Sequence, residues 1–140
     1  STRARPVLAA DAIVLDAEGK VLVITRKNPP FRGQRAFPGT LVAAAETAAA
    51  ALKREVKDET DLDIVVEQRI GRYDAPARDP RGHIVSEAFL CRLERPGQVL
   101  RCREDAGEAH FVTLAELRGE DLAFDHEDML QDALLRLNLR

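Results

Sequence analysis

The sequence predicts an α/β fold in which a mixed β-sheet is packed between helices. Runs rich in β-branched residues come in pairs around short turn-forming clusters, which is typical of β-hairpins. Two other segments carry strong helix formers or apolar residues at helical spacing. Hairpins interleaved with helices favour a mixed sheet with helices packed on it. The 140 residues fit one ordinary domain, so we expect a single domain over residues 1–140.

The first predicted element is a hairpin over residues 7–27, VLAADAIVLDAEGKVLVITRK. The cluster DAEG at its centre is turn-forming, and Gly19 is able to take a positive φ. Residues 28–39, NPPFRGQRAFPG, hold three prolines and two glycines and therefore predict a loop. A helix follows from Ala48 to Glu59, with Thr47 as a plausible N-cap.

The second half of the chain predicts three more strands and a closing helix. The strands are expected within residues 63–75, 83–94 and 108–114, and Thr113 is a possible cap for a short turn of helix. The segment DHEDMLQDALLRLNLR predicts an amphipathic helix capped by Asp125. Its apolar residues recur at helical spacing: Met129, Leu130, Ala133, Leu134 and Leu137.

Composition and charge exclude several classes of protein. With 45% hydrophobic and 32% charged residues, the chain is globular rather than disordered. A net charge of −3 argues against a strong electrostatic grip on nucleic acid or on an anionic membrane. No apolar run approaches the roughly 20 residues of a membrane span, and the first residues lack a signal-peptide pattern. Cys91 and Cys102 form no disulfide framework, so we expect free thiols in a reducing cytoplasm.

The helix predicted after Thr47 gathers acidic residues on one stripe. At about 100° per residue, three carboxylates form one narrow stripe, because two of them lie within about one-sixth of a turn either side of Glu55. They are Glu55, Asp58 and Glu59. Leu52 and Val56 flank this stripe, whereas the lysines of the helix take the far side. The acids therefore lie at the edge of the buried face, where a carboxylate needs compensation.

Two kinds of compensation fit this stripe. A hard divalent cation such as Mg²⁺ or Mn²⁺ prefers oxygen ligands and bridges carboxylates to a substrate phosphate. Arg54 is able instead to pair with a neighbouring acid and orient it. Spacing alone leaves a metal site and a structural salt-bridge helix equally open.

Residues 40–62 resemble the Nudix box of the nucleoside-diphosphate-linked hydrolases, whose pattern is G-x5-E-x7-R-E-U-x-E-E-x-G-U with U an aliphatic residue. The pattern fits without a gap at six positions: Glu46, Arg54, Glu55, Val56, Glu59 and Leu62. Three positions depart from it. Thr40 stands at the opening glycine, Asp58 at the first of the paired glutamates and Asp61 at the closing glycine. The preceding AFPG resembles the family's lead-in.

The resemblance extends to KNPPFRGQRAFPG, RDPRGHIVSEAFL and LAFDHEDMLQDAL, which look like segments of ADP-ribose pyrophosphatase-type members. It implies the Nudix α/β/α sandwich and a homodimer. Some relatives carry a DNA-binding domain after the Nudix domain, and we expect none after Arg140. The implied reaction is attack of water on the pyrophosphate of ADP-ribose, which yields AMP and ribose 5-phosphate with Mg²⁺ or Mn²⁺ as cofactor.

The resemblance also implies roles for individual residues. The implied metal ligands are the backbone carbonyl of Gly39 and four acids, Glu46, Glu55, Asp58 and Glu59. The implied catalytic group is Arg54, Glu55 and Glu59, with Glu55 as a candidate for the base that activates water. Asp105 and Glu108 are weaker candidates from a second loop.

Substrate binding is expected from basic residues in two loops. Arg78, Arg81 and His83 in RDPRGH suit phosphate or ribose oxygens, although the same loop also fits a turn with exposed charges. Arg35, near Pro38, is a further candidate. The other histidines are interpreted as structural, with His126 serving the packing of a helix start.

Three hypotheses follow. The first is a metal-dependent hydrolase of ADP-ribose or a related nucleoside diphosphate derivative. The second is a catalytically weak Nudix domain that binds a nucleotide as a sensor or partner module, and it rests on Thr40, the AAA turn just before Glu46, Asp58 and Asp61. The third is a structural domain without a ligand.

Overall fold

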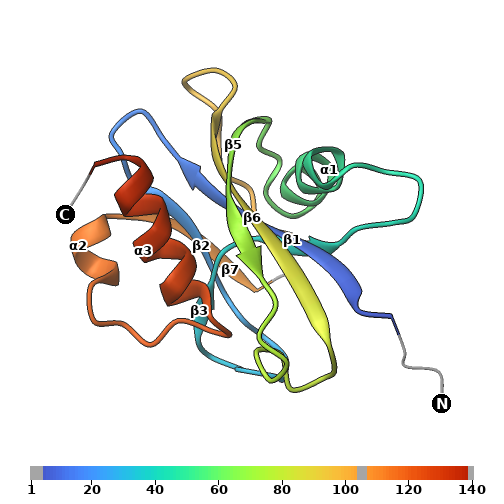
Figure 1. Ribbon diagram of the computed structural model, residues 1–140. Helices are drawn as coiled ribbons and strands as arrows, with labels where there is room; N and C mark the ends of the chain where they lie inside the picture. Colours follow the sequence, from blue (N-terminus) through green and yellow to red (C-terminus); the bar gives the residue numbers. More distant parts are fainter. Residues whose placement is uncertain (1–4, 104–106, 139–140) are drawn as a thin grey trace, which may run out of the picture.

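The computed structural model describes residues 5–103 and 107–138, and within them one seven-stranded sheet lies between two layers of helices (Figure 1). Helix α1 covers one face of the sheet, and α2 and α3 cover the other. The elements follow in the order β1 (Val7–Leu15), β2 (Val21–Thr25), β3 (Arg35–Ala36), β4 (Gly39–Leu41), α1 (Ala48–Thr60), β5 (Ile64–Tyr73), β6 (Ile84–Leu93), β7 (Glu108–Val112), α2 (Leu114–Leu117) and α3 (His126–Arg136).

The sheet is mixed, as the sequence predicts. Its main order is β3-β2-β1-β6-β5, while β4 pairs with β1 and β7 pairs with β2. Strands β1 and β6 run parallel over nine residue pairs, from Val7 opposite Ile84 to Leu15 opposite Arg92. The other strand pairs are antiparallel, and β4 places Gly39 opposite Asp11.

Alternation along the central strands builds a core on each face. On β1, Ala10, Ala12 and Val14 face α1, whereas Ile13 belongs to the core beneath α3. Both faces of β1 are thus buried, which explains its nearly continuous apolar sequence. Because side chains alternate, Asp11 is directed to the same face as Ile13 and is buried there.

Local signals placed most boundaries correctly. The turn after β1 is held by Asp16, whose Oδ1 accepts from the N–H groups of Glu18 and Lys20 at 2.9 and 2.8 Å. The hydroxyl of Thr47 caps α1 by accepting from Ala50 N–H at 3.1 Å, which confirms the predicted N-cap. Asp61 ends α1 in the left-handed region with φ 62°.

Two predictions about local structure are wrong. The loop expected over residues 28–39 contains strand β3 and the first residue of β4, because pairing with β2 and β1 organises this segment. Asp125 stands at the start of α3 but its side chain makes no capping hydrogen bond, because it binds Arg78 instead. No helix in the described part of the chain is long and apolar enough to cross a membrane.

Candidate functional site

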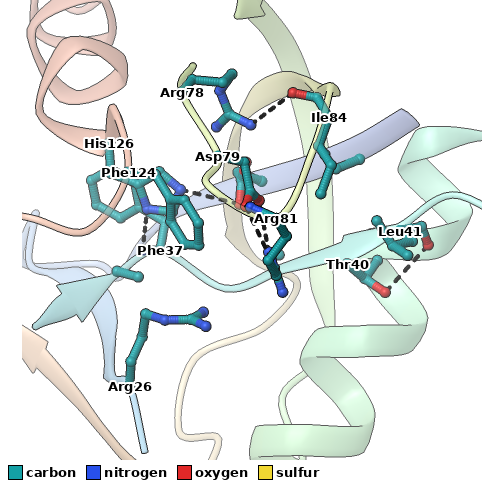
Figure 2. A pocket seen from close by; sticks show the side chains of 14 residues that line it. Arg26, Phe37, Thr40, Leu41, Arg78, Asp79, Arg81, Ile84, Phe124 and His126 are labelled. Atoms are coloured by element: carbon teal, nitrogen blue, oxygen red, sulfur yellow. Dashed lines mark hydrogen bonds and ion pairs between the residues drawn. The ribbon is translucent and has the colours of Figure 1, made fainter. Parts of the chain in front are cut away.

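A cavity of about 360 Å³ opens between the β1–β4 pair, the loop joining β5 to β6, and the start of α3 (Figure 2). Its wall includes six charged or imidazole side chains from four parts of the chain: Asp11, Arg26, Arg78, Asp79, Arg81 and His126. Its volume falls within the range of about 300–1,000 Å³ usual for small-molecule sites. The cavity is therefore large enough to hold part of a nucleotide.

The floor of this cavity is a buried hydrogen-bonded group on β1, β6 and α3. The hydroxyl of Ser86 donates to Oδ2 of Asp11, and Nε2 of His126 lies 3.4 Å from Asp11 Oδ1. The N–H of Phe37 donates to Nδ1 of His126 at 3.0 Å. Because Nδ1 accepts a hydrogen bond, the imidazole proton lies on Nε2, facing the carboxylate.

The Asp11 carboxylate is held ionised in this setting. Burial by itself would raise the pKa of Asp11, but His126, the Ser86 hydroxyl and the nearby charge of Arg78 outweigh burial. The resulting pKa lies below the ordinary value for an aspartate. A fixed negative charge therefore lies under the cavity.

Gly39 is packed directly against this carboxylate. A Cβ atom at Gly39 would lie 2.1 Å from Oδ1 of Asp11 and 3.0 Å from the carbonyl oxygen of Ala10. Only a residue without a side chain fits there while Asp11 stays in place. The glycine is thus required by close approach rather than by its backbone conformation.

Two arginines of the β5–β6 loop are fixed by carboxylates. The side chain of Arg78 is buried and donates two hydrogen bonds to Asp125, from Nε to Oδ2 at 2.8 Å and from Nη2 to Oδ1 at 2.7 Å. Arg81 pairs with Asp79, yet 53% of its side chain is exposed. Arg78 thus pins the loop to α3, whereas Arg81 remains accessible from the cavity.

Phe124 forms a platform on which arginine side chains converge (Figure 2). The guanidinium carbon of Arg26 lies 4.9 Å from the ring centroid, and that of Arg81 lies 5.6 Å from it. Burial, followed by the like charge of Arg81, lowers the pKa of Arg26. Nε of Arg26 donates to the Pro30 carbonyl at 2.6 Å, and no carboxylate of residues 5–103 or 107–138 forms an ion pair with it. This side of the cavity suits an anionic group.

A second cavity of about 210 Å³ adjoins the first and reaches helix α1. The two share four lining residues, Arg26, Ala36, Phe37 and Gly39. Only the second cavity includes Glu59. The structure thus brings Gly39 and Glu59, two of the predicted metal ligands, to one concavity.

The remaining acids of the predicted metal group lie along α1 and the turn before it. Oε1 of Glu46 lies 2.8 Å from Nη2 of Arg54, and Oε2 of Glu55 lies 3.8 Å from Nη1. The hydrogen bond from Arg54 lowers the pKa of Glu46. Arg54 therefore joins two of the predicted acids, as the salt-bridge interpretation of the helix requires. Glu55 is half-buried, and Asp58 is exposed.

Comparison with known proteins decides the family. The family model described as the NUDIX domain matches residues 5–133. This chain belongs to the Nudix hydrolase family. It is 43% identical over 127 residues to the ADP-ribose pyrophosphatase of Methanocaldococcus jannaschii. The aligned residues make up 91% of this chain and 72% of that protein.

Solved structures share the fold of this Nudix domain. A MutT/nudix family protein from Enterococcus faecalis superposes with a TM-score of 0.81 at 30% identity, over 98% of this chain and 64% of that one. The NUDIX domain of Shewanella oneidensis NrtR was determined in complex with ADP ribose. It superposes with a TM-score of 0.78 at 23% identity, over 96% of this chain and 90% of that one. The predicted α/β/α sandwich is thereby confirmed.

Nudix hydrolases generally use divalent metal ions, and the donors of this Nudix domain fit such an ion in kind. The predicted ligands offer only carboxylate and carbonyl oxygens, which hard cations prefer. Within residues 5–103 and 107–138, no three His, Cys, Asp or Glu side chains are gathered closely enough to hold an ion. The donor chemistry therefore fits a divalent cation, while the side chains that the structure describes form no closed ligand set.

Three other predicted site residues, Arg35, His83 and Glu108, line neither of the two cavities. Arg35 lies 3.7 Å from Glu116 of α2 and 3.2 Å from Glu120, which follows that helix. His83 is exposed, and its carbonyl accepts from Val7 N–H at 3.0 Å. Asp105 is outside the described residues, and the Glu108 side chain is 79% exposed. Their roles in binding or catalysis stay predictions.

Sequence reasoning missed four residues that shape the site: Asp11, Arg26, Ser86 and Phe124. A signal existed for Asp11, because an acid in the middle of an apolar strand is seldom buried without a purpose. His126 is more than a packing residue, because both of its ring nitrogens make polar contacts.

Proposed function

We propose that this Nudix domain hydrolyses the pyrophosphate of ADP-ribose or a related nucleoside diphosphate derivative to AMP and a sugar phosphate. The observation that carries the proposal is the pair of adjoining cavities. Glu59 lines one of them, Arg81 and Phe124 line the other, and Arg26 and Gly39 line both. A pyrophosphate is anionic, and its hydrolysis requires cations that neutralise the phosphate charge. The two adjoining cavities offer arginine side chains for the phosphates and carboxylate and carbonyl oxygens for a metal ion.

In the proposed reaction, water adds to one phosphorus and the bridging P–O bond breaks. The bridging oxygen leaves with the other phosphate, and the proton of the water passes to a carboxylate. A divalent cation, Mg²⁺ or Mn²⁺, supplies neutralisation of the phosphate charge when bound. Glu55, Asp58 and Glu59 with the Gly39 carbonyl are its proposed ligands, and Glu46 lies beside them, paired with Arg54.

The chain's own residues would then have separate tasks. Glu55 is our candidate for the base, because it is half-buried and Arg54, 3.8 Å away, is close enough to orient its carboxylate. Arg26 and Arg81 would bind the anionic part of the substrate over Phe124, while Arg78 would hold the loop that carries Arg81. Support for ADP-ribose comes from the named activity of the 43% identical relative. A cytoplasmic location, a homodimer and the lack of a nucleic-acid partner stay predictions.

The proposal is tested by phosphate release from ADP-ribose, coupled to a phosphatase, in Mg²⁺ and in Mn²⁺. We expect turnover by the wild type, and at least a 100-fold loss of kcat/KM in Glu59→Gln. Glu67→Gln is a matched control, because Glu67 pairs with Arg92 on β6 rather than with the cavity. A wild type that releases no phosphate in either metal, or a Glu59→Gln variant as active as the control, would defeat the proposal.

A second candidate is favoured by the departures from the family pattern. A catalytically weak domain that binds the nucleotide as a sensor would keep the cavities while Thr40 and Asp58 reduce turnover. Calorimetric binding of ADP-ribose without turnover would support this candidate. The double change Thr40→Gly with Asp58→Glu should then raise turnover. If turnover does not rise, Thr40 and Asp58 are not the cause of the weak activity.

A further inference from the structure

We propose that Asp11 and His126 are positioning residues that fix the segment Phe37–Gly39 between the two cavities and thereby place the carbonyl of Gly39. The inference rests on the proposed function, because it concerns the same site. It assigns a task to a buried polar group that the proposed reaction leaves unused.

Three contacts fix this segment, one at each of its residues. The N–H of Phe37 donates to Nδ1 of His126 at 3.0 Å, and the carbonyl of Pro38 accepts from Ala12 N–H at 2.8 Å. The Cα of Gly39 lies so close to Asp11 that a Cβ there would meet the carboxylate at 2.1 Å. The anchors come from β1 and α3, so the segment is positioned by both the sheet and a covering helix.

Burial makes these anchors rigid. His126 and Phe37 are each 3% exposed, and their rings stack with centroids 5.4 Å apart at an interplanar angle of 10°. Ser86 is fully buried and binds the second oxygen of Asp11. Replacing a buried ionic group with apolar residues is often neutral or stabilising, so core packing alone does not require this group. Its polar atoms are explained by what they hold, which is the backbone of the segment.

The segment Phe37–Gly39 lies between the two cavities, so a displacement of it would change the shape of both. Phe37 and Gly39 line both cavities, whereas Asp11 and His126 line only the arginine-rich one. Gly39 shares the second cavity with Glu59. Loss of an anchor would therefore shift a wall of the substrate cavity and a proposed metal ligand together.

A nucleophilic role for the same residues does not fit the geometry. In a Ser-His-Asp triad the imidazole stands between the hydroxyl and the carboxylate. Here the carboxylate stands in the middle, because Ser86 donates to one oxygen of Asp11 and His126 faces the other. His126 is thus unable to take the hydroxyl proton, and the arrangement serves position rather than covalent chemistry.

Two substitutions of His126 separate positioning from packing. Asparagine places a carbonyl oxygen near the Nδ1 position and retains an acceptor for Phe37 N–H. Glutamine places its polar end near the Nε2 position and loses that acceptor. Tyr73→Phe is the matched control, because it removes the 2.7 Å hydrogen bond from Tyr73 to Asp132 on the same helix without touching the segment.

The measurements are the Mn²⁺ dissociation constant, by electron paramagnetic resonance without substrate, and hydrogen exchange at the Phe37 amide. Altered support of a metal ligand typically changes affinity about 10- to 100-fold. We expect His126→Gln to weaken Mn²⁺ binding at least about 10-fold and to speed exchange at Phe37. His126→Asn should stay within about threefold of the wild type, and Tyr73→Phe should match the wild type in both measurements.

Three results would overturn the inference: a wild type that binds no Mn²⁺, equal Mn²⁺ affinity in the wild type and His126→Gln, or equal losses in the two His126 variants. If His126→Gln does not fold, Asp11→Asn takes its place. Its amide turns an N–H towards His126 or Ser86, and the same loss of affinity is expected. A wild type that binds Mn²⁺ but leaves ADP-ribose intact would defeat the proposed function alone.

Discussion

Replacement of Gly39 by alanine tests the close packing at the centre of the site. Gly39 does not have a positive φ, so alanine suffers no backbone strain there, and the whole cost is steric. Its Cβ would lie 2.1 Å from a carboxylate oxygen that Ser86 and His126 hold in place. Overpacking costs about 1–3 kcal/mol, and a disrupted buried hydrogen bond adds about 1–3 kcal/mol. We expect Gly39→Ala to lower the free energy of unfolding by about 3 kcal/mol in all.

Urea unfolding followed by circular dichroism measures this loss, and thermal unfolding should show a fall in Tm of about 10 °C. Gly19→Ala is the control, because Gly19 has φ +78° with no atom within 4 Å of an added Cβ. It should cost only the left-handed strain of about 1–2 kcal/mol. In an Asp11→Ala background the cost of Gly39→Ala should fall by at least about 1.5 kcal/mol, because the two residues touch.

The reasoning would be refuted by a Gly39→Ala protein whose free energy of unfolding lies within about 0.5 kcal/mol of the wild type, the usual limit for harmless surface changes. It would also be refuted if the cost were the same with and without the Asp11 carboxylate. Either result would mean that the segment and the buried group are not packed against each other.

Three further predictions concern caps, thiols and acid stability. Thr47→Ala should lower the free energy of unfolding by about 1 kcal/mol in urea titrations, because Ala50 N–H loses its acceptor, while Thr47→Ser should not. With a thiol reagent at neutral pH, Cys102 should react quickly and Cys91 only on unfolding, because burial, and then Glu67, raises the pKa of Cys91 to about 12; two fast thiols would contradict this. Because the pKa of Asp11 is lowered on folding, its ionised form stabilises the protein above the unfolded value near 3.8, and this stabilisation disappears as the pH falls through the folded pKa. The difference in unfolding free energy between the wild type and Asp11→Asn should therefore shrink below about pH 4 in acid titrations, and a constant difference would contradict the lowered pKa.

Local chemistry made the elements predictable. The predicted helix over 48–59 differs from α1 by one residue, because the Thr47 hydroxyl starts it and the left-handed Asp61 ends it. The hairpin turn is likewise set by neighbours, since Asp16 binds backbone groups two and four residues away. Strands β3 and β4 carried no such signal, because two or three residues form a strand only through the partner they pair with.

The residues of the candidate site also fall into those that the sequence predicts and those that only the tertiary structure identifies. Glu55, Asp58 and Glu59 could be assigned to one stripe because helical geometry fixes their spacing. The buried group beneath the cavity could not, since Phe37 and His126 are 89 positions apart and Asp11 and Ser86 are 75 apart. No periodicity links such residues, and only the sheet register and the docking of α3 bring them together.

The sequence by itself thus determined the order of the elements other than β3 and β4, the acidic stripe, and the family to which its spacing points, because each depends on residues that are neighbours along the chain. The tertiary structure decided which charges face the cavities. It paired Arg78 with Asp125 and Arg35 with Glu116 and Glu120, directed Arg26 to Phe124, and placed Gly39 against Asp11. The physical reason is that a charged side chain takes the partner nearest in space, and that partner is chosen by the packing of elements distant in sequence.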